Sequence, residues 1–500
     1  MDVMMPLIQM RRNPTIFHGS RCPGVSRRSF LADTGLGFTG RALSAMLGRA
    51  AAPPDGDHTI WTPPDGDPHF RPKARAVIWI FLCGGLSHVE SFDVKPALTK
   101  YAGKSIEDTP FAGVLKTAQK DIVGGNPNHG NRKVLMPLQT GYKAYGQSGL
   151  EVSDWFPHIG SCADDLAVVR SLWTKDNDHG AQLTWHTGRH VREGGLPTVG
   201  SWACYGLGTL NANLPEYVVL GTPTGDCCGG AWTHGAGYLG PEHAGVRLTP
   251  DPAKPLPFLQ GPHTREQQMD ELSLLGKLNT LSGIDYPEDR DLRARLKSYE
   301  LAFQMQAAVP EAVQLDRESE STRNSYGFDV PHCADFARLC LTARRLVERG
   351  VRFVQIFHGG GGGGAWDAHS GIQANHSQLA AQVDQPIGAL LKDLKQRGLF
   401  SDTTVVCGTE FGRSPGAEGN GRDHHPQGFS AWLAGAGIKG GIAHGATDEI
   451  GYHAIQDRHY VTDIHATVLE LLGLDSRRLE VPGRRRLEID HGEAIREIMT

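Results

Sequence analysis

Short segments that are apolar throughout recur along this chain, and they constrain its fold more than any other feature. The clearest is Ala76–Leu82, which reads AVIWIFL and precedes Cys83-Gly84-Gly85. A continuous apolar run of this length is typical of a strand that is buried on both faces of a parallel sheet. Similar runs occupy residues 166–169, 217–220, 351–357, 403–407 and 429–433. The chain therefore predicts a large sheet of buried strands.

Helical patterns lie between several of these runs. Residues 334–349 carry apolar side chains at helical spacing, and Gly350 ends the pattern before the next strand. Residues 379–394 and 463–472 show the same spacing. Because strands and helices alternate, we expect an α/β fold with a large, mostly parallel sheet that helices cover on both faces. We expect a single domain over residues 74–500, with a charged helical excursion near residues 265–325.

Charge and hydropathy argue against a nucleic-acid partner and against a membrane-spanning segment. The net charge is -5 and the pI is about 6.5, and no run of like charges suggests an interaction tail. We therefore expect no nucleic-acid partner. The chain has no stretch of about 18 uninterrupted apolar residues, the length that spans a bilayer. We expect no transmembrane anchor in the mature chain.

The amino-terminal segment matches an export signal. Residues 26–31 read SRRSFL, which fits the twin-arginine signature, and a segment rich in small residues runs through Ala50-Ala51-Ala52. We expect residues 1–55 to be a leader and the protein to reach the periplasm or the cell surface. The alternative is that the two arginines are adjacent by chance, because Asp33 and Arg41 interrupt the apolar region that follows them.

The nine cysteines show no paired spacing, so no dense disulfide framework is predicted. Cys227 and Cys228 are adjacent, and neighbouring cysteines bridge each other only with difficulty. We expect most of the thiols to be free and buried.

Clusters of polar residues follow the predicted strands, where an open α/β sheet gathers its ligands. Asp367 and His369 are two residues apart, so both point to one side if the segment is extended. Asp423 and His424 are consecutive and costly to bury without a cation or mutual hydrogen bonds; the alternative is a solvated loop. Glu410 follows the strand at 403–407, and His444 follows a short apolar segment. Carboxylates and imidazoles together suit zinc or manganese, whereas calcium requires oxygen ligands.

Other polar residues lie near these clusters. Arg413 could bind an anionic oxygen, or it could form an ion pair with Glu410. His88 follows the first strand, and His179 lies in a loop that enters a short helix. Six glycines at residues 359–364 predict either a loop that approaches a ligand closely or a flexible insertion.

The chain resembles the twin-arginine exported, sulfatase-like members of the family called domain of unknown function 1501. The resemblance covers nearly everything from Ala76 to Met499. It is carried by Gly84-Gly85-Leu86-Ser87-His88, Trp366-Asp367-Ala368-His369, Glu410-Phe411-Gly412-Arg413 and Gly421-Arg422-Asp423-His424. More distantly, residues 183–189, 408–412 and 462–473 are similar to segments of the alkaline phosphatase and sulfatase superfamily, whose fold is a large α/β sandwich with metal ligands at strand ends.

The resemblance implies that Glu410 takes the place of a ligand aspartate and His444 that of a late metal-binding histidine. Two features depart from the superfamily. Cys83-Gly84-Gly85 stand where an aspartate is usual, and the nucleophile position falls near Asp178 rather than on serine, threonine or cysteine. No Cys-x-Pro-x-Arg sequence occurs, so the formylglycine chemistry of true sulfatases is not predicted for this chain.

We therefore expect an exported metal-dependent hydrolase that acts on phosphate or sulfate esters, with a small-molecule or saccharide anionic ester as substrate. Its cofactor would be one or two divalent ions, zinc or manganese. Arg413 or Arg422 would stabilise developing charge, and His88 or His179 would donate a proton. The alternative is a sulfatase-like envelope protein whose catalysis has decayed and whose role is binding or structural. The expected metal ligands are Asp367, His369, Glu410, Asp423, His424 and His444.

Overall fold

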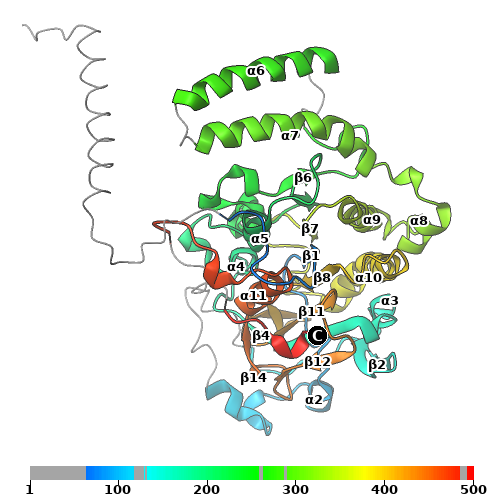
Figure 1. The fold of residues 1–500 in the computed structure, drawn as a ribbon. Coiled ribbons are helices and arrows are strands. Elements are labelled where there is room, and N and C mark those ends of the chain that lie inside the picture. Colours follow the sequence, from blue (N-terminus) through cyan, green and yellow to red (C-terminus); the bar gives the residue numbers. More distant parts are fainter. Residues whose placement is uncertain (1–63, 117–128, 130–131, 258–262, 286–289, 485–491) are drawn as a thin grey trace, which may run out of the picture. The chain divides into compact units, whose positions relative to one another are not determined.

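A nine-stranded sheet organises the computed structural model, which describes residues 64–116, 129, 132–257, 263–285, 290–484 and 492–500 (Figure 1). The strand order is β12-β4-β11-β8-β1-β7-β5-β6, and β15 also pairs with β4. Within this sheet β11 alone runs opposite to its neighbours, β4 and β8. The strands are β1 Ala76–Leu82, β4 Leu166–Trp173, β5 Tyr217–Leu220, β6 Val246–Leu248, β7 Phe353–His358, β8 Thr403–Gly408, β11 Phe429–Gly435, β12 Ile442–His444 and β15 His459–Tyr460.

The predicted α/β fold with a large, mostly parallel sheet is confirmed. Each of the apolar runs is a strand, and β1 and β5 have the predicted bounds. The helices between them are also found: α9 Ala334–Glu348, α10 Ile372–Gln396 and α11 Val461–Leu471. The pattern did not predict the direction of β11, because a buried strand reads the same in either direction.

Alternate residues of β1 enter two different cores. Ile78 and Ile80 pack among side chains of α9 and α10, whereas Trp79 and Phe81 pack on the other face of the sheet among side chains of α4 (Ala181–Thr187), α5 (Val199–Leu207) and α11. Successive side chains of a strand point to opposite faces, so a run that is apolar at every position is buried between two helical layers.

The register of the central strands brings their carboxyl ends together. Leu82 of β1 pairs with His358 of β7, and Phe81 pairs with Gly408 of β8. The segments that begin at Cys83, Gly359 and Thr409 therefore leave the sheet at the same edge. These segments carry most of the polar clusters of the sequence.

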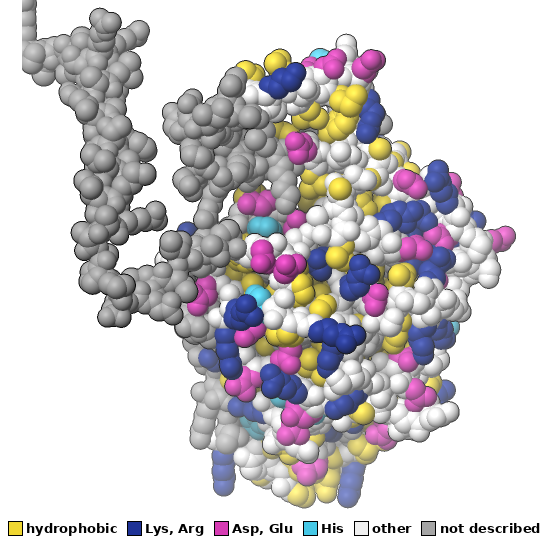
Figure 2. Space-filling view, in the orientation of Figure 1, with side chains coloured by type: hydrophobic (Ala, Val, Ile, Leu, Met, Phe, Trp, Pro, Cys, Tyr) yellow, Lys and Arg dark blue, Asp and Glu magenta, His cyan; other side chains and the backbone are white. Residues whose placement is uncertain are grey.

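The remaining described elements lie outside this sheet. Helices α6 and α7 contact each other, and α7 also contacts α9. No helix of the described residues combines the length and apolar character needed to cross a membrane. Figure 2 shows basic and acidic side chains interspersed over the visible face. The other elements are α2 Pro96–Lys100, α3 Pro157–Gly160, α6 Arg265–Asp285, α7 Arg290–Ala312, α8 Glu320–Tyr326, and the strand pairs β2 Tyr142–Tyr145 with β3 Leu150–Ser153, β9 Gly412–Glu418 with β10 Gly421–His425, and β13 Ala446–Thr447 with β14 Ala454–Gln456.

The expected twin-arginine leader at residues 1–55 lies outside the described residues.

Candidate metal centre

Close backbone packing at the end of β1 shapes one side of the site. The amide of Gly84 donates to both carboxylate oxygens of Glu410, at 2.9 and 3.1 Å. Gly84 has a φ of 118°, and a Cβ there would lie 2.6 Å from the backbone nitrogen of Asp367. Only glycine suits this position, because an L side chain would meet both backbone strain and a clash. The backbone amide of Gly84 thus holds the Glu410 carboxylate beside the end of β1.

Asp367, His369 and His424 bring three donor atoms together, and we call these residues the donor triangle. His369 Nε2 lies 3.0 Å from His424 Nε2 and 3.2 Å from Asp367 Oδ1, and His424 Nε2 lies 3.1 Å from the same oxygen. Ligands of a tetrahedral zinc ion lie roughly 3.4 Å apart, given zinc–ligand distances of about 2.1 Å. The triangle is therefore close to the size that one such cation needs.

The outer ring nitrogens of both histidines are held by acceptors. Nδ1 of His369 lies 2.5 Å from the carboxylate of Glu418, and Nδ1 of His424 lies 2.8 Å from the carbonyl oxygen of Asn177. Because these groups accept, each Nδ1 carries a proton, so the neutral form of each ring has its lone pair on Nε2. Two lone pairs that face each other at 3.0 Å require a proton or a cation between them.

His179, which lies between β4 and α4, connects the donor triangle to Glu410. Its Nδ1 is 3.2 Å from Glu410 Oε1, and its Nε2 is 3.1 Å from Asp367 Oδ2. Burial lowers the pKa of His179, but the hydrogen bonds to Asp367 and Glu410 outweigh burial and raise that pKa to about 9. His179 therefore carries a proton at neutral pH in this arrangement.

The protonation of the triangle follows from burial and these neighbours. Burial raises the pKa of Asp367, but its contacts with His179, His369 and His424 hold that pKa well below its usual range, and the contact with Asp367 raises the pKa of His369. Burial lowers the pKa of His424 to about 3, and the nearby guanidinium of Arg413 also lowers it. The triangle thus presents one carboxylate and at least one neutral imidazole, which are the forms that bind a divalent metal.

Arg413 is fully buried and orients Asp367. Its Nη2 donates to Asp367 Oδ1 at 2.8 Å, and its Nε donates to the carbonyl oxygen of Gly85 at 2.9 Å. Further donations reach the carbonyl oxygens of Gly84 and Arg422. The alternative ion pair between Arg413 and Glu410 is not present among these contacts. Arg413 therefore orients Asp367, and each of its three guanidinium nitrogens donates to a protein acceptor.

Arg422 lies in a separate buried ion pair. Its guanidinium donates to Glu90 Oε1 at 3.0 and 2.6 Å, and both side chains are fully buried. Its other donors reach the carbonyl oxygens of Ser414, Pro415, Met136 and Pro137. The structure does not bring Arg422 to the donor triangle, and its contacts hold the β9–β10 hairpin in place.

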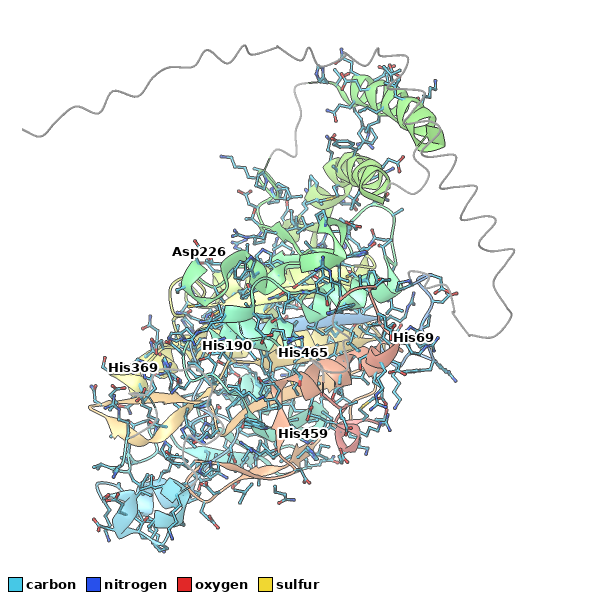
Figure 3. All side chains as sticks on the ribbon, turned by 90° about the vertical axis from the view of Figure 1, so that its left-hand side faces the viewer. His69, His190, Asp226, His369, His459 and His465 are labelled. Atoms are coloured by element: carbon cyan, nitrogen blue, oxygen red, sulfur yellow. The ribbon has the colours of Figure 1, made fainter. Side chains whose placement is uncertain are left out.

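Two of the expected site histidines lie elsewhere. His88 is buried with Nε2 2.9 Å from the carbonyl oxygen of Gly451. His444 lies on the edge strand β12 with Nε2 2.9 Å from Nε2 of His459, which Figure 3 shows well away from His369. Strand β12 is three strand spacings from β8, or about 14 Å. His444 therefore cannot reach the cation that Glu410 or the triangle would bind, which corrects the expected ligand set.

Asp423 lies behind the donor triangle and contacts His129, a residue that the sequence analysis did not single out. Asp423 Oδ1 is 2.6 Å from His129 Nδ1 and 3.7 Å from His369 Nδ1, and Asp423 Oδ2 accepts from Arg132 Nε at 3.0 Å. Asp423 therefore contacts the outer side of the histidines. His129 and Glu418 were missed because neither lies near an apolar run. Within the part of the chain that the structure describes, three further groups have donor atoms close enough to hold an ion: His179 with Asp367 and His424, His129 with His369 and His424, and His369 with Glu418 and Asp423.

A pocket of about 430 Å³ opens beside the centre. Asp367 and His179 contribute to its lining, together with Gly363 from the glycine segment and Arg192. Gly363 packs directly on His179, since a Cβ there would lie 2.8 Å from the imidazole. The glycine segment therefore lies beside His179 at the wall of this pocket.

The sequence matches the family described as "Protein of unknown function (DUF1501)" over residues 74–499. The chain belongs to this family. The resemblance proposed from the sequence motifs is confirmed, and the match covers the whole sheet and every residue of the centre. No curated protein sequence matches the chain.

Several solved structures share a distant likeness with this member of the DUF1501 family. A sulfatase from Pseudoalteromonas sp. is 14% identical with a TM-score of 0.33, over 84% of this chain and 73% of that one. A phosphonate monoester hydrolase from Silicibacter pomeroyi is 12% identical with a TM-score of 0.32, over 68% and 72%. TAB5 alkaline phosphatase, a mutant with Mg bound, is 11% identical with a TM-score of 0.31, over 81% and 99%. Likenesses this small do not decide the chemistry of the centre.

Proposed function

We propose that this protein is an exported metal-dependent hydrolase of phosphate or sulfate esters. The observation that carries the proposal is the donor triangle: Asp367, His369 and His424 converge within 3.0 to 3.2 Å, with the Nε2 atoms of both imidazoles directed inward. A carboxylate with two imidazoles is a donor set for zinc or manganese. The fit to such an ion is supported by the outer partners of both histidines, which fix the tautomer that ligation needs.

The residues that would hold the cation are therefore Asp367, His369 and His424. Glu410 is not in this set, because it contacts His179, which in turn contacts Asp367. A divalent cation there would supply Lewis-acid chemistry for ester hydrolysis. Asp423 and Glu418 would hold the histidines from outside, and His444 is not part of the proposed set.

His179 has the properties of a proton donor. It lines the pocket, holds a proton on Nε2 beside Asp367, and keeps that proton because Glu410 accepts from Nδ1. A substrate that enters the pocket could receive this proton on its leaving-group oxygen. Arg413 would keep Asp367 ionised and correctly oriented for the same step.

The test combines elemental analysis of the purified protein with turnover of chromogenic phosphate and sulfate esters. We expect about one equivalent of zinc or manganese per chain and measurable turnover of one ester class. His424→Ala should lose both, because it removes one vertex of the triangle. His444→Ala is the matched control and should keep both, since His444 contacts His459 instead. A folded protein that lacks metal, or a His424→Ala variant that retains it, would contradict the proposal.

A binding role is the second candidate, and the nucleophile position favours it. Asp178 stands where the resemblance places a serine, threonine or cysteine, and it lines the same pocket. Stoichiometric metal without turnover of any ester would support this role instead of hydrolysis.

Export and domain organisation are part of the proposal. We infer that residues 1–55 direct twin-arginine export and that residues 74–500 act as one domain. Replacement of Arg27 and Arg28 by lysine should retain the protein in the cytoplasm, as cell fractionation would measure. Periplasmic delivery of that variant would contradict the inference.

A further inference from the structure

Two adjacent thiols lie on the wall of the pocket beside the candidate metal centre. Cys227 and Cys228 belong to a 3₁₀ helix at Asp226–Cys228, and their Sγ atoms are 2.7 Å apart. A disulfide bond needs about 2.05 Å, so a small movement would bring the two sulfurs to bonding distance. Adjacent cysteines were expected to bridge only with difficulty, but this backbone already directs both side chains to the same side.

The two thiols differ in access. Cys227 is exposed, and every other cysteine that the structure describes is buried. Cys228 is 2% exposed. Burial, followed by the contact with Cys227, raises the pKa of the Cys228 thiol. An oxidant from solution would therefore meet Cys227 first, and Cys228 would be held against it as the second reactant.

Both thiols contact the glycine segment that leads to the metal centre. Cys227 Sγ and Cys228 Sγ lie 3.6 and 3.3 Å from the carbonyl oxygen of Gly362. Gly225, two residues before Cys227, packs on Gly362 so closely that a Cβ would lie 2.8 Å from the Gly362 nitrogen. The cysteine segment and the glycine segment therefore pack directly against each other, and the glycine segment continues into Asp367.

We propose that Cys227 and Cys228 are a redox-active pair that closes to a vicinal disulfide at the wall of this pocket. The oxidant is a small-molecule disulfide such as glutathione disulfide. The Cys227 thiolate attacks one of its sulfurs, so an S–S bond forms to Cys227 and one thiol of the oxidant leaves. Cys228 Sγ then loses its proton and attacks Cys227 Sγ, which releases the second thiol. Two protein thiols are oxidised, and one disulfide is reduced to two thiols.

Closure of the pair changes the site through Gly362. The disulfide carries no S–H, so the carbonyl oxygen of Gly362 loses both thiol donors. Gly363, the next residue, contacts His179 and accepts from Gln182 Nε2 at 2.7 Å. Oxidation should therefore displace the glycine segment relative to His179 and Asp367. Any consequence of this displacement for metal binding or turnover rests on the proposed function, whereas formation of the disulfide does not.

The experiment counts thiols in the full-length protein after incubation with glutathione disulfide. Acid quenching, alkylation and tryptic mass analysis examine the peptide between Arg192 and Arg247, which also contains Cys204. We expect the wild type to lose two alkylatable thiols and the mass of two hydrogen atoms. Cys204→Ala should behave in the same way. Cys228→Ser should stop with one glutathione attached to Cys227, because its resolving thiol is absent.

Two results would overturn the redox pair: a stable glutathione adduct in the wild type, or closure that persists in Cys228→Ser through another cysteine. A zinc titration of oxidised and reduced protein tests the coupling separately. We expect oxidation to weaken zinc binding about tenfold in the wild type and not in Cys227→Ser. Equal affinities would overturn the coupling, whereas the thiol count remains valid even if the protein hydrolyses no ester.

Discussion

Arg413 and Arg422 are both fully buried arginines of the β9–β10 hairpin, but their partners give them different roles. Arg413 donates to Asp367 of the donor triangle, whereas Arg422 forms an ion pair with Glu90. A sequence motif cannot separate these roles, because both residues follow acidic or glycine-rich segments. The difference lies in which carboxylate the fold brings to each guanidinium.

Substitution by lysine separates the two roles. A lysine keeps the charge but cannot reproduce the planar set of donors. We expect Arg413→Lys and Arg422→Lys each to lower the free energy of unfolding by about 2 kcal/mol, because buried acceptors lose their donors. Only Arg413→Lys should weaken zinc binding, by about tenfold, since Asp367 loses its orienting partner. Denaturant unfolding and zinc titration measure the two effects. An equal loss of zinc affinity in Arg422→Lys would show that Arg422 belongs to the centre.

At the scale of elements, the β9–β10 hairpin positions one of the three residues of the donor triangle. It carries His424 on β10, opposite Arg413 on β9, and a register shift lies between Arg422 and His424. Such a bulge re-aims a side chain, and here His424 reaches Asp367 while Arg422 stays in the core. Glu418, at the end of β9, holds the outer nitrogen of His369.

Glu418 offers a test of the hairpin's contribution. Glu418→Gln replaces a charged acceptor of the His369 Nδ1 proton with a neutral amide, so His369 becomes a weaker and less ordered ligand. We expect zinc affinity to fall by about tenfold or more. Glu449→Gln changes an exposed carboxylate of the same charge outside the hairpin and should leave the affinity unchanged. If the two variants bind zinc equally well, the outer carboxylate does not tune the centre.

The sequence predicted the sheet far better than the hairpin, for a physical reason. Buried strands such as β1 are apolar at every position because both of their faces meet helices. Residues 421–425 are also buried in a strand, but their sequence is polar and therefore resembles a loop. Their burial is possible because ion pairs such as Arg422 with Glu90 compensate the charges. Asp367 and His424 were found as candidates from their chemistry alone. The distance between Asp367 and His424 depends on strand pairing between distant parts of the chain, which local sequence patterns do not encode. The same holds for the distance of His444 from the donor triangle.

At the scale of the whole molecule, both cores contain histidines that are buried in neutral form. His465 of α11 packs against Trp79 of β1, with ring centroids 5.8 Å apart, and its Nε2 donates to the carbonyl oxygen of Trp185 at 2.7 Å. Burial lowers the pKa of His465 to about 4, and it has the same effect on His234 and His358. The folded protein therefore disfavours the protonated form of these imidazoles.

This preference for the neutral form predicts that acid weakens the fold. An unfolded histidine binds a proton below about pH 6.5, whereas His465 in the folded protein binds one only near pH 4. Its contribution to stability is therefore complete above pH 6.5 and is lost as the pH falls from there toward 4. Between pH 7 and pH 5 this one residue should cost about 2 kcal/mol of unfolding free energy. His465→Gln keeps a donor for Trp185 but cannot titrate, so urea unfolding should show a smaller loss over this range. His332→Gln, at an exposed position, should leave the loss unchanged. An identical pH dependence in His465→Gln and the wild type would mean that His465 is protonated without cost in the folded core.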